Sequence, residues 1–437
     1  MNIRKSLKAL SSLWIGSIAA AFLAFLTQVI LARVLGPVEY GILSSALSAA
    51  TLIAPLAGFG VPQLWLKIFG VEGFNGTRWI PVSFRFIKIS SVLTVLLLIA
   101  WAQVAQHNTA TQIILYILAF HIIHQLFIEI TSSKLQLEER YQLLSLLQIL
   151  PHALRLLAIL ATSLIAPKML NALAVAIIYA AVSIPVVIFG MIELLKMKRG
   201  EFLLKGHKQP TSLQSIKSQQ PTLLNIFFDA MPFGMAATFH LIMFQVNIII
   251  INYIAGPKEA GIYNVAFAIM TAVYLTPSVI YQKFLLPKIH RWAIHDRARF
   301  TAVYKKGNIA MLLLGILAMV LVAILAPRGV PLLFGEKYTE AVLILQILSL
   351  CAPLRFLASS VGVTLVTQEH MKLKVYLMGI AATFNTLSSI ILIKDLGITG
   401  AAVSTVISDL LLLSLYYYCA QKKVFSNVSP NFAEKTK

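Results

Sequence analysis

The chain has 437 residues, of which 59% are hydrophobic and only 12% are charged, and its mean hydropathy is +0.84. A water-soluble fold cannot bury that much apolar surface, so the composition excludes the soluble classes and predicts a membrane protein. The net charge of +20 is split among short connectors between apolar runs instead of forming one stripe. We therefore expect no nucleic-acid partner.

The N-terminus combines a basic segment with an apolar run, in MNIRKSLKALSSLWIGSIAAAFLAF. A secretory signal peptide has the same two parts. Here the apolar run continues to about Leu31 without an obvious small-residue cleavage site. We interpret it as a first transmembrane helix that is retained.

Apolar runs along the chain have the length of membrane-spanning helices, which need roughly 20 residues to cross about 30 Å of hydrocarbon. The runs are continuous and lack the alternation of barrel strands, so backbone hydrogen bonding in lipid requires helices. The sequence predicts an all-α integral membrane protein with twelve transmembrane helices, at 10–34, 41–62, 86–106, 110–132, 142–166, 171–195, 223–254, 260–286, 303–327, 340–367, 371–394 and 398–420.

Lysine and arginine are distributed unequally between the two sides of the predicted membrane. The N-terminus, the C-terminal tail and the connectors after the even-numbered helices hold 28 of the 36, whereas the opposite connectors hold 6. Cytoplasmic loops are the ones enriched in these residues. We therefore expect both termini to lie in the cytoplasm.

The longest polar stretch divides the chain near its middle. It runs from Lys196 to Thr222 between the sixth and seventh predicted helices, and its composition is typical of a linker. We expect an N-terminal six-helix bundle at 1–195, a cytoplasmic linker at 196–222, and a C-terminal six-helix bundle with a short tail at 223–437.

The two halves carry the same turn motif, because LARVLGPVEYGI at 31–42 matches INYIAGPKEAGI at 251–262 at an offset of 220 residues. Each copy joins the first two helices of its half, and both halves start on the cytoplasmic side, so the repeats are parallel and suggest a transporter. Proline stops one helix and glycine frees the backbone for the next. We interpret six positions as structural turn residues: Gly36, Pro37, Gly41, Gly256, Pro257 and Gly261.

Four motifs carry a resemblance to a known family: ARVLGP-x-EYG, its copy AGPKEAGIYNVAF, the later FGEKYTEAVLILQILSL and the closing DLGITGAAVST. They resemble the polysaccharide transporters of the multidrug/oligosaccharidyl-lipid/polysaccharide (MOP) flippase superfamily. The resemblance implies two six-helix bundles around a central cavity, in a flippase of the bacterial inner membrane. Its substrate would be an undecaprenyl-diphosphate-linked oligosaccharide, moved outward by alternating access without a cofactor. Membrane lipids, a polysaccharide polymerase and a chain-length regulator are the partners it suggests.

Two arginines, Arg155 and Arg355, lie inside predicted helices, and each follows a proline, Pro151 or Pro353. A charge at mid-membrane costs roughly 2.5–3.5 kcal/mol on insertion scales, which makes such residues candidates for function. A guanidinium is well suited to a diphosphate, so we expect both to face the cavity and bind the substrate. Pairing with a buried acid and snorkelling to a head group are the alternatives.

Arg33 ends the first predicted helix, and Tyr253 takes its place in the second repeat. The turn itself therefore does not require arginine at this position. Either Arg33 lines the cavity as a substrate contact, or it anchors the helix by reaching the phosphates of the outer leaflet.

Asp409 is the one acid near the middle of a predicted helix. An isolated carboxyl group in lipid is protonated unless it is paired. Asp409 is a candidate to carry a coupling proton, and the alternative is that it neutralises an arginine such as Arg355.

His121 and His124 share one face of a predicted helix at a spacing that metal sites use. No acid or cysteine joins them at ligand spacing within that helix, so we predict no metal site. Together with His240, we expect them to line the cavity and to hydrogen-bond sugar hydroxyls.

Other functions fit parts of the pattern. A membrane polymerase or ligase would need catalytic residues in a sizeable external segment, and the longest external connector has about a dozen residues, so we expect no enzyme. An ion-coupled multidrug exporter of the same superfamily would need acids in its cavity to hold cations. A lipid II flippase would usually have two further helices. A channel fits the composition, but the duplicated plan favours alternating access, and the carried glycan stays open.

Overall fold

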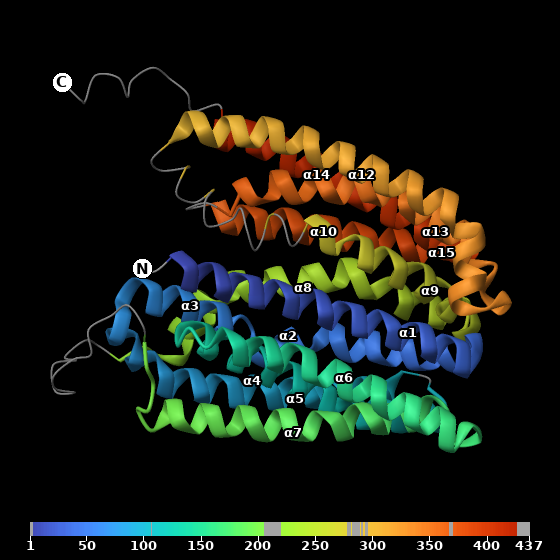
Figure 1. The fold of residues 1–437 in the computed structure, drawn as a ribbon, viewed down its shortest axis with the longest axis horizontal. Coiled ribbons are helices and arrows are strands. Elements are labelled where there is room, and N and C mark those ends of the chain that lie inside the picture. The colour runs from blue at the N-terminus through green and yellow to red at the C-terminus, as the bar shows by residue number, and fades with distance from the viewer. Residues whose placement is uncertain are drawn as a thin grey trace. The chain divides into compact units, whose positions relative to one another are not determined.

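All regular structure in the described part of the chain is helical (Figure 1). The computed structural model describes residues 3–105, 107–204, 220–277, 281, 289, 292, 296–366 and 370–425. The predicted all-α fold is therefore confirmed.

Two very long helices each contain two of the predicted spans. Helix α1 (Ile3–Ile53) leaves helical geometry at Gly36, where φ is 73°, and α15 (Met371–Cys419) does so at Gly397, where φ is 59°. A straight helix of about 50 residues would measure about 75 Å, more than twice the hydrocarbon thickness. The two glycines therefore divide these segments into separate spans, and both lie in predicted connectors, at 35–40 and 395–397.

Packing divides the chain into two compact units, residues 1–264 and 265–437. Helix α8 packs against α1, α3 and α4, so it belongs to the first unit although it opens the second sequence repeat. The predicted division into bundles at 1–195 and 223–437 stays a prediction. The first unit contains α1, α2 (Pro55–Gly58), α3 (Val61–Glu72), η1 (Gly73–Trp79), α4 (Ile80–Val104), α5 (Thr109–Leu137), α6 (Tyr141–Ile165), η2 (Pro167–Met169), α7 (Ala172–Lys198), α8 (Leu223–Ile254) and the start of α9 (Pro257–Val273).

Side-chain caps fix where three helices of the first unit begin. Asn108 before α5 and Asn171 before α7 each accept a backbone N–H from the first helical turn. Thr222 before α8 forms a reciprocal capping box with Asn225. These caps satisfy N–H groups that a helix start leaves unpaired, and they place the starts of α5, α7 and α8 within a residue of the predicted spans.

The second unit contains the rest of α9 and the helices that follow it. Its exposed face on α12 carries large apolar side chains, as a lipid-facing helix requires: Ile309, Leu313, Leu317, Leu321, Ile324 and Leu325. The remaining elements are α10 (Leu275–Pro277), α12 (Arg297–Phe334), η5 (Glu336–Tyr338), α13 (Ala341–Ser349), α14 (Cys351–Thr364), α15 and η7 (Ala420–Phe425).

The described residues contain nine stretches that are long and apolar enough to cross a membrane. The first, Ile15–Val104, holds both halves of α1 together with α4, and the last, Met371–Phe425, holds both halves of α15. Counting those parts separately is consistent with the twelve predicted helices. The chain is thus a multi-pass membrane protein.

The predicted span at 41–62 is interrupted in the structure. The sequence predicts a helix over 41–62, but the backbone breaks after α1, where Phe59 and Gly60 have φ values of 37° and 83°. A Cβ on Gly60 would collide with backbone atoms of Ala230 and Gly234 in α8. The close packing of α8 on this segment explains the break, which hydropathy cannot detect.

Candidate functional site

The two copies of the turn motif contact each other inside the first unit. A Cβ on Gly41 would collide with backbone atoms of Pro257 and Gly261, and a Cβ on Gly261 would collide with the Pro37 carbonyl oxygen and press tightly against the Gly41 nitrogen. Pro37 and Pro257 are 220 residues apart, as are Gly41 and Gly261, so the contact is reciprocal. Such a contact is what two parallel repeats make when their equivalent turns meet.

A hydrogen-bonded chain continues from this contact. The Tyr40 hydroxyl donates to Gln28 Oε1 at 2.8 Å and accepts from Asn264 Nδ2 at 2.8 Å. Gly256, the first residue of the second GP pair, has a φ of 107°, a value that favours glycine. Pro37, Gly41, Pro257 and Gly261 thus meet in a closely packed junction, and the turn role of all six glycines and prolines stays a prediction.

Two of the predicted substrate-binding residues are exposed in the first unit. Arg33 lies in α1, close to the break at Gly36, and its side chain is exposed. His240 lies in α8, and its ring contacts Phe244 with 4.5 Å between the ring centroids. Neither residue joins His121 and His124, which are buried.

A cluster of basic and aromatic side chains lies between α5, α6 and α7. It consists of His121 and His124 from α5, His152 and Arg155 from α6, and Tyr179 from α7, and we call it the His–Arg cluster. The Arg155 guanidinium lies 4.4 Å from the Tyr179 ring centroid, and the two α5 imidazoles stack with centroids 5.8 Å apart. The Arg155 charge acts on all three histidines.

Arg155 carries a buried charge that no acid in the described residues compensates. Its side chain is 4% exposed, and its electrostatic partner among the described residues is Tyr179. Its Nε and Nη2 have no hydrogen-bond partner within the described part of the chain, and neither do Nδ1 of His121 and Nδ1 of His124. The cluster therefore combines a buried positive charge with unused hydrogen-bonding capacity.

Arg355 of α14 has a different environment inside the second unit. Its Nε donates to Oδ2 of Asp409 in α15 at 2.6 Å, and its guanidinium lies 4.6 Å from the Tyr274 ring centroid. The Arg355 side chain is 11% exposed, and Asp409 is buried. Of the two roles that the sequence leaves open for Asp409, the neutralisation of Arg355 is the one that this geometry supports. Substrate binding by Arg355 stays a prediction.

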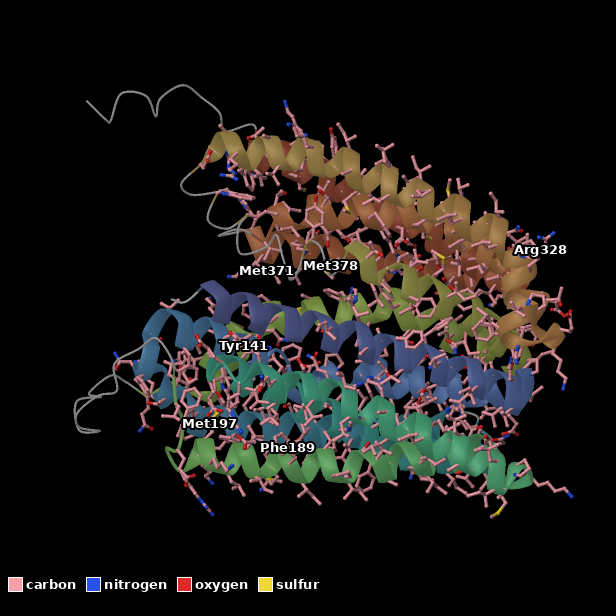
Figure 2. All side chains as sticks on the ribbon, viewed as in Figure 1. Tyr141, Phe189, Met197, Arg328, Met371 and Met378 are labelled. Carbon is pink, nitrogen blue, oxygen red and sulfur yellow. The ribbon has the colours of Figure 1, made fainter. Side chains whose placement is uncertain are left out.

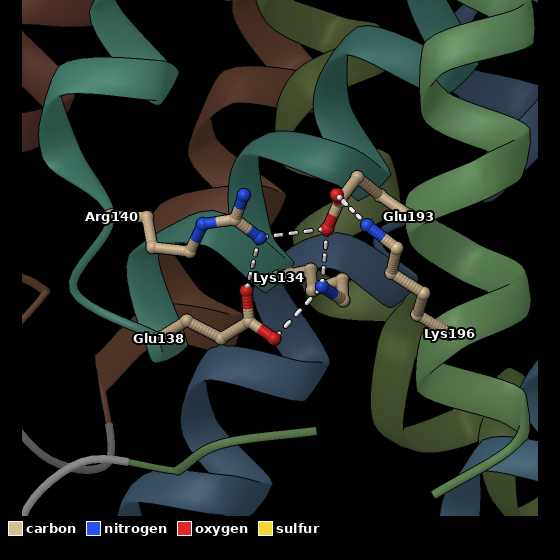
Figure 3. A network of polar contacts seen from close by, with 5 residues as sticks. All are labelled: Lys134, Glu138, Arg140, Glu193 and Lys196. Carbon is tan, nitrogen blue, oxygen red and sulfur yellow. Dashed lines mark hydrogen bonds and ion pairs between the residues drawn. The ribbon is translucent and has the colours of Figure 1, made fainter. Parts of the chain in front are cut away.

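A further network of buried charge, which the sequence pattern did not indicate, lies at one end of α5 and α7 (Figure 3). Lys134 Nζ lies 2.7 Å from Glu193 Oε2 and 2.8 Å from Glu138 Oε1. Arg140 bridges the same two carboxylates, and Lys196 pairs with Glu193 at 3.0 Å. Lys134 is 1% exposed, so it is a buried cation.

The Lys134 network lies beside an apolar core that joins the same helices. Leu135, Leu144, Leu147 and Val186 are buried together. Tyr141 and Phe189, labelled in Figure 2, pack against them. Burial of the ions next to this core removes solvent screening, and their attraction is therefore stronger than that of surface pairs.

Comparison with known families identifies the chain. A family model described as "Polysaccharide biosynthesis protein" matches residues 6–293, more than half of the chain. The chain belongs to the polysaccharide biosynthesis protein family. The resemblance carried by the turn motifs is thus confirmed at the level of the family.

Two relatives of this family member align over most of its length. An uncharacterized membrane protein in the cps region of Klebsiella pneumoniae is 23% identical over 439 residues, which cover 97% of this chain and 84% of the relative. An uncharacterized membrane protein of Methanocaldococcus jannaschii is 21% identical over 397 residues, with coverage of 89% and 91%. Both relatives are described as membrane proteins.

Solved structures of other membrane proteins share the fold of this chain. It resembles the lipid II flippase MurJ in an inward closed conformation, with a TM-score of 0.67, 14% identity, and coverage of 94% of this chain and 87% of MurJ. It also resembles a MATE protein in complex with Br-NRF, with a TM-score of 0.61, 12% identity, and coverage of 95% and 94%. At these identities the likeness shows the fold alone.

Proposed function

We propose that this protein moves a polyprenyl-diphosphate-linked oligosaccharide from the cytoplasmic to the outer leaflet by alternating access. Family membership and the fold shared with MurJ support a transporter of a lipid-linked precursor. The bacterial cytoplasmic membrane is the proposed location, with both termini in the cytoplasm. A polysaccharide polymerase and a chain-length regulator are proposed partners, and the protein itself catalyses no bond change.

The buried carboxylates bear on which class of substrate the protein transports. Three carboxylates are buried in the described residues, Glu138, Glu193 and Asp409, and all three are ion-paired. None of these is left to hold an organic cation, as a multidrug exporter would require. The chain as a whole carries 36 lysine and arginine residues against 16 aspartate and glutamate residues. This balance favours an anionic substrate.

Arg33 is the proposed contact for the diphosphate. It is exposed beside the turn, where a guanidinium can bind phosphate oxygens through paired hydrogen bonds. His240, which is exposed on α8, is proposed to hydrogen-bond the sugars. Lysine at position 33 would keep the charge but lose the planar fork, so Arg33→Lys should transport less than the native protein.

Deletion of the gene tests the proposal in the cell. We expect lipid-linked repeat units to accumulate on the cytoplasmic side and surface polysaccharide to be lost, and we expect the native gene to restore export. Deletion that leaves export unchanged but raises sensitivity to cationic dyes would reverse the assignment to a multidrug exporter, a function that the MATE likeness makes the second candidate.

A further inference from the structure

We propose that the His–Arg cluster is a binding site for a small inorganic anion, enclosed between α5, α6 and α7 of the first unit. A halide such as chloride is the simplest occupant. The proposal goes beyond the transport function, since it concerns an ion held inside one unit whether or not a lipid-linked sugar is carried.

The buried charge of Arg155 favours a bound anion. Arginine stays protonated in proteins, so burial cannot remove its charge as it can for histidine or lysine. An uncompensated ion inside a protein costs much more than one cation–π contact returns. Tyr179 supplies that contact, and no carboxylate in the described residues acts on the guanidinium. An anion would supply the missing charge.

The unpaired nitrogens of the His–Arg cluster also favour a bound anion. Four nitrogens lack a partner within the described residues: Nε and Nη2 of Arg155, Nδ1 of His121 and Nδ1 of His124. A buried polar nitrogen is normally hydrogen-bonded, because desolvation without a partner is costly. Arginine offers donors only, and neutral histidine can place its proton on either ring nitrogen. The cluster can therefore present several donors to one acceptor.

Enclosure sets the size of the ligand. Arg155, His121 and His124 are all buried, and side chains of three packed helices surround them. A polyprenyl diphosphate carrying a glycan and a lipid tail needs an open groove, whereas a halide needs only a few donors. A metal cation is disfavoured, since the fixed positive charge of Arg155 would repel it.

The other buried cations of the chain show what the cluster lacks. Lys134 contacts two carboxylates, and Arg355 contacts one. Arg155 is enclosed as they are, but its helix neighbours contribute histidines where theirs contribute acids. The ligand, and not a protein side chain, would complete the site.

Thermal unfolding of the full-length protein in detergent tests the site. The melting temperature is measured in sodium chloride and in sodium gluconate at equal ionic strength, without lipid-linked substrate. We expect chloride to raise the melting temperature of the native protein by about 2–4 °C, because a ligand that binds only the folded state stabilises it. Arg155→Gln should remove this difference. Lys168→Gln is the matched control, because it removes an exposed cation between α6 and α7 and should keep the difference.

Bromide soaked into crystals of the native protein gives a second measurement that does not depend on any variant. An anomalous peak against Arg155 and the α5 histidines supports the site, and occupied bromide sites elsewhere with none at the cluster would overturn it. An equal chloride effect in the native protein and Arg155→Gln, or none in the native protein, would also overturn it. An Arg155-dependent shift with pyrophosphate but not chloride would instead place the cluster on the substrate path and reject the small anion. Failure of transport alone would leave these results unchanged, so the two proposals fail separately.

Discussion

Arg155 of the first unit and Arg355 of the second unit have similar sequence settings but different partners in the folded protein. Both are arginines inside helices, and both lie over a tyrosine ring, at 4.4 Å for Tyr179 and 4.6 Å for Tyr274. Arg355 also has an ion pair with Asp409, whereas no acid in the described residues acts on Arg155. Asp409 neutralises the charge of Arg355, and we propose that a bound anion neutralises the charge of Arg155.

An arginine inside a membrane helix therefore does not by its position alone indicate its role. In a buried ion pair the two charges compensate each other, so removal of one partner leaves the other charge uncompensated in a low dielectric. A buried cation without an acid has no compensating charge in the protein, so a bound anion can supply it. Substitutions at the two sites should therefore have opposite effects on stability.

The largest expected effect is at Asp409. Asp409→Asn leaves Arg355 buried without its counter-ion and should lower the free energy of unfolding by about 3–5 kcal/mol. Denaturant unfolding in detergent measures the loss. Replacing both residues together, Arg355→Met with Asp409→Leu, should recover most of it. If Asp409→Asn lowers the free energy of unfolding no more than the double substitution does, Arg355 and Asp409 do not compensate each other's charge.

Lys134 extends the comparison to a buried cation with two acids. Lys134→Met should lower the free energy of unfolding by about 2–3 kcal/mol, less than Asp409→Asn because Arg140 and Lys196 still pair with Glu193. Lys196→Met is the matched control. Its side chain is 43% exposed, so its removal should cost at most about 1 kcal/mol. Equal losses in the same unfolding experiment would mean that burial does not strengthen this network.

Tyr179 and Tyr274 stabilise the two arginines to different degrees. Tyr179→Leu removes the cation–π contact of Arg155, and Tyr274→Leu removes that of Arg355. Relative to each Tyr→Phe control, which keeps a ring, we expect a larger loss at Tyr179, by about 1 kcal/mol, because Arg355 keeps its carboxylate. Thermal unfolding in halide-free buffer measures both. A larger loss at Tyr274 would show that the ion pair does not dominate there.

The smallest expected effect is at Arg155 itself. In halide-free buffer Arg155→Gln should change the free energy of unfolding by less than about 1 kcal/mol, or raise it, because an uncompensated charge is removed. Arg355→Gln under the same conditions should lower it, because Asp409 loses its partner. A loss at Arg155 as large as that at Arg355 would reveal an internal counter-charge at the first site.

The fold could be predicted from the sequence where hydropathy and turn chemistry agree. The predicted span 223–254 coincides with α8, and Gly36 and Gly397 break the helices where expected. The break at Phe59 could not be predicted, because its cause is the approach of α8 from a distant part of the chain.

The candidate site could be predicted only in its single residues. The sequence placed His121 and His124 on one helix face and singled out Arg155 by itself, but it could not show that all three share one interior with Tyr179. The pairing of Arg355 with Asp409 was one of two open roles, since the residues are 54 positions apart. The Lys134 network was missed because its main partner, Glu193, is 59 positions away.

Transport by the purified protein in liposomes tests the proposed function without other cell components. A fluorescent polyprenyl-diphosphate oligosaccharide is placed in the membrane, and a membrane-impermeant quencher reports its leaflet. We predict that the native protein moves the lipid-linked oligosaccharide between leaflets and that protein-free liposomes do not. Redistribution no faster than in protein-free liposomes, together with efflux of cationic dyes, would contradict the account.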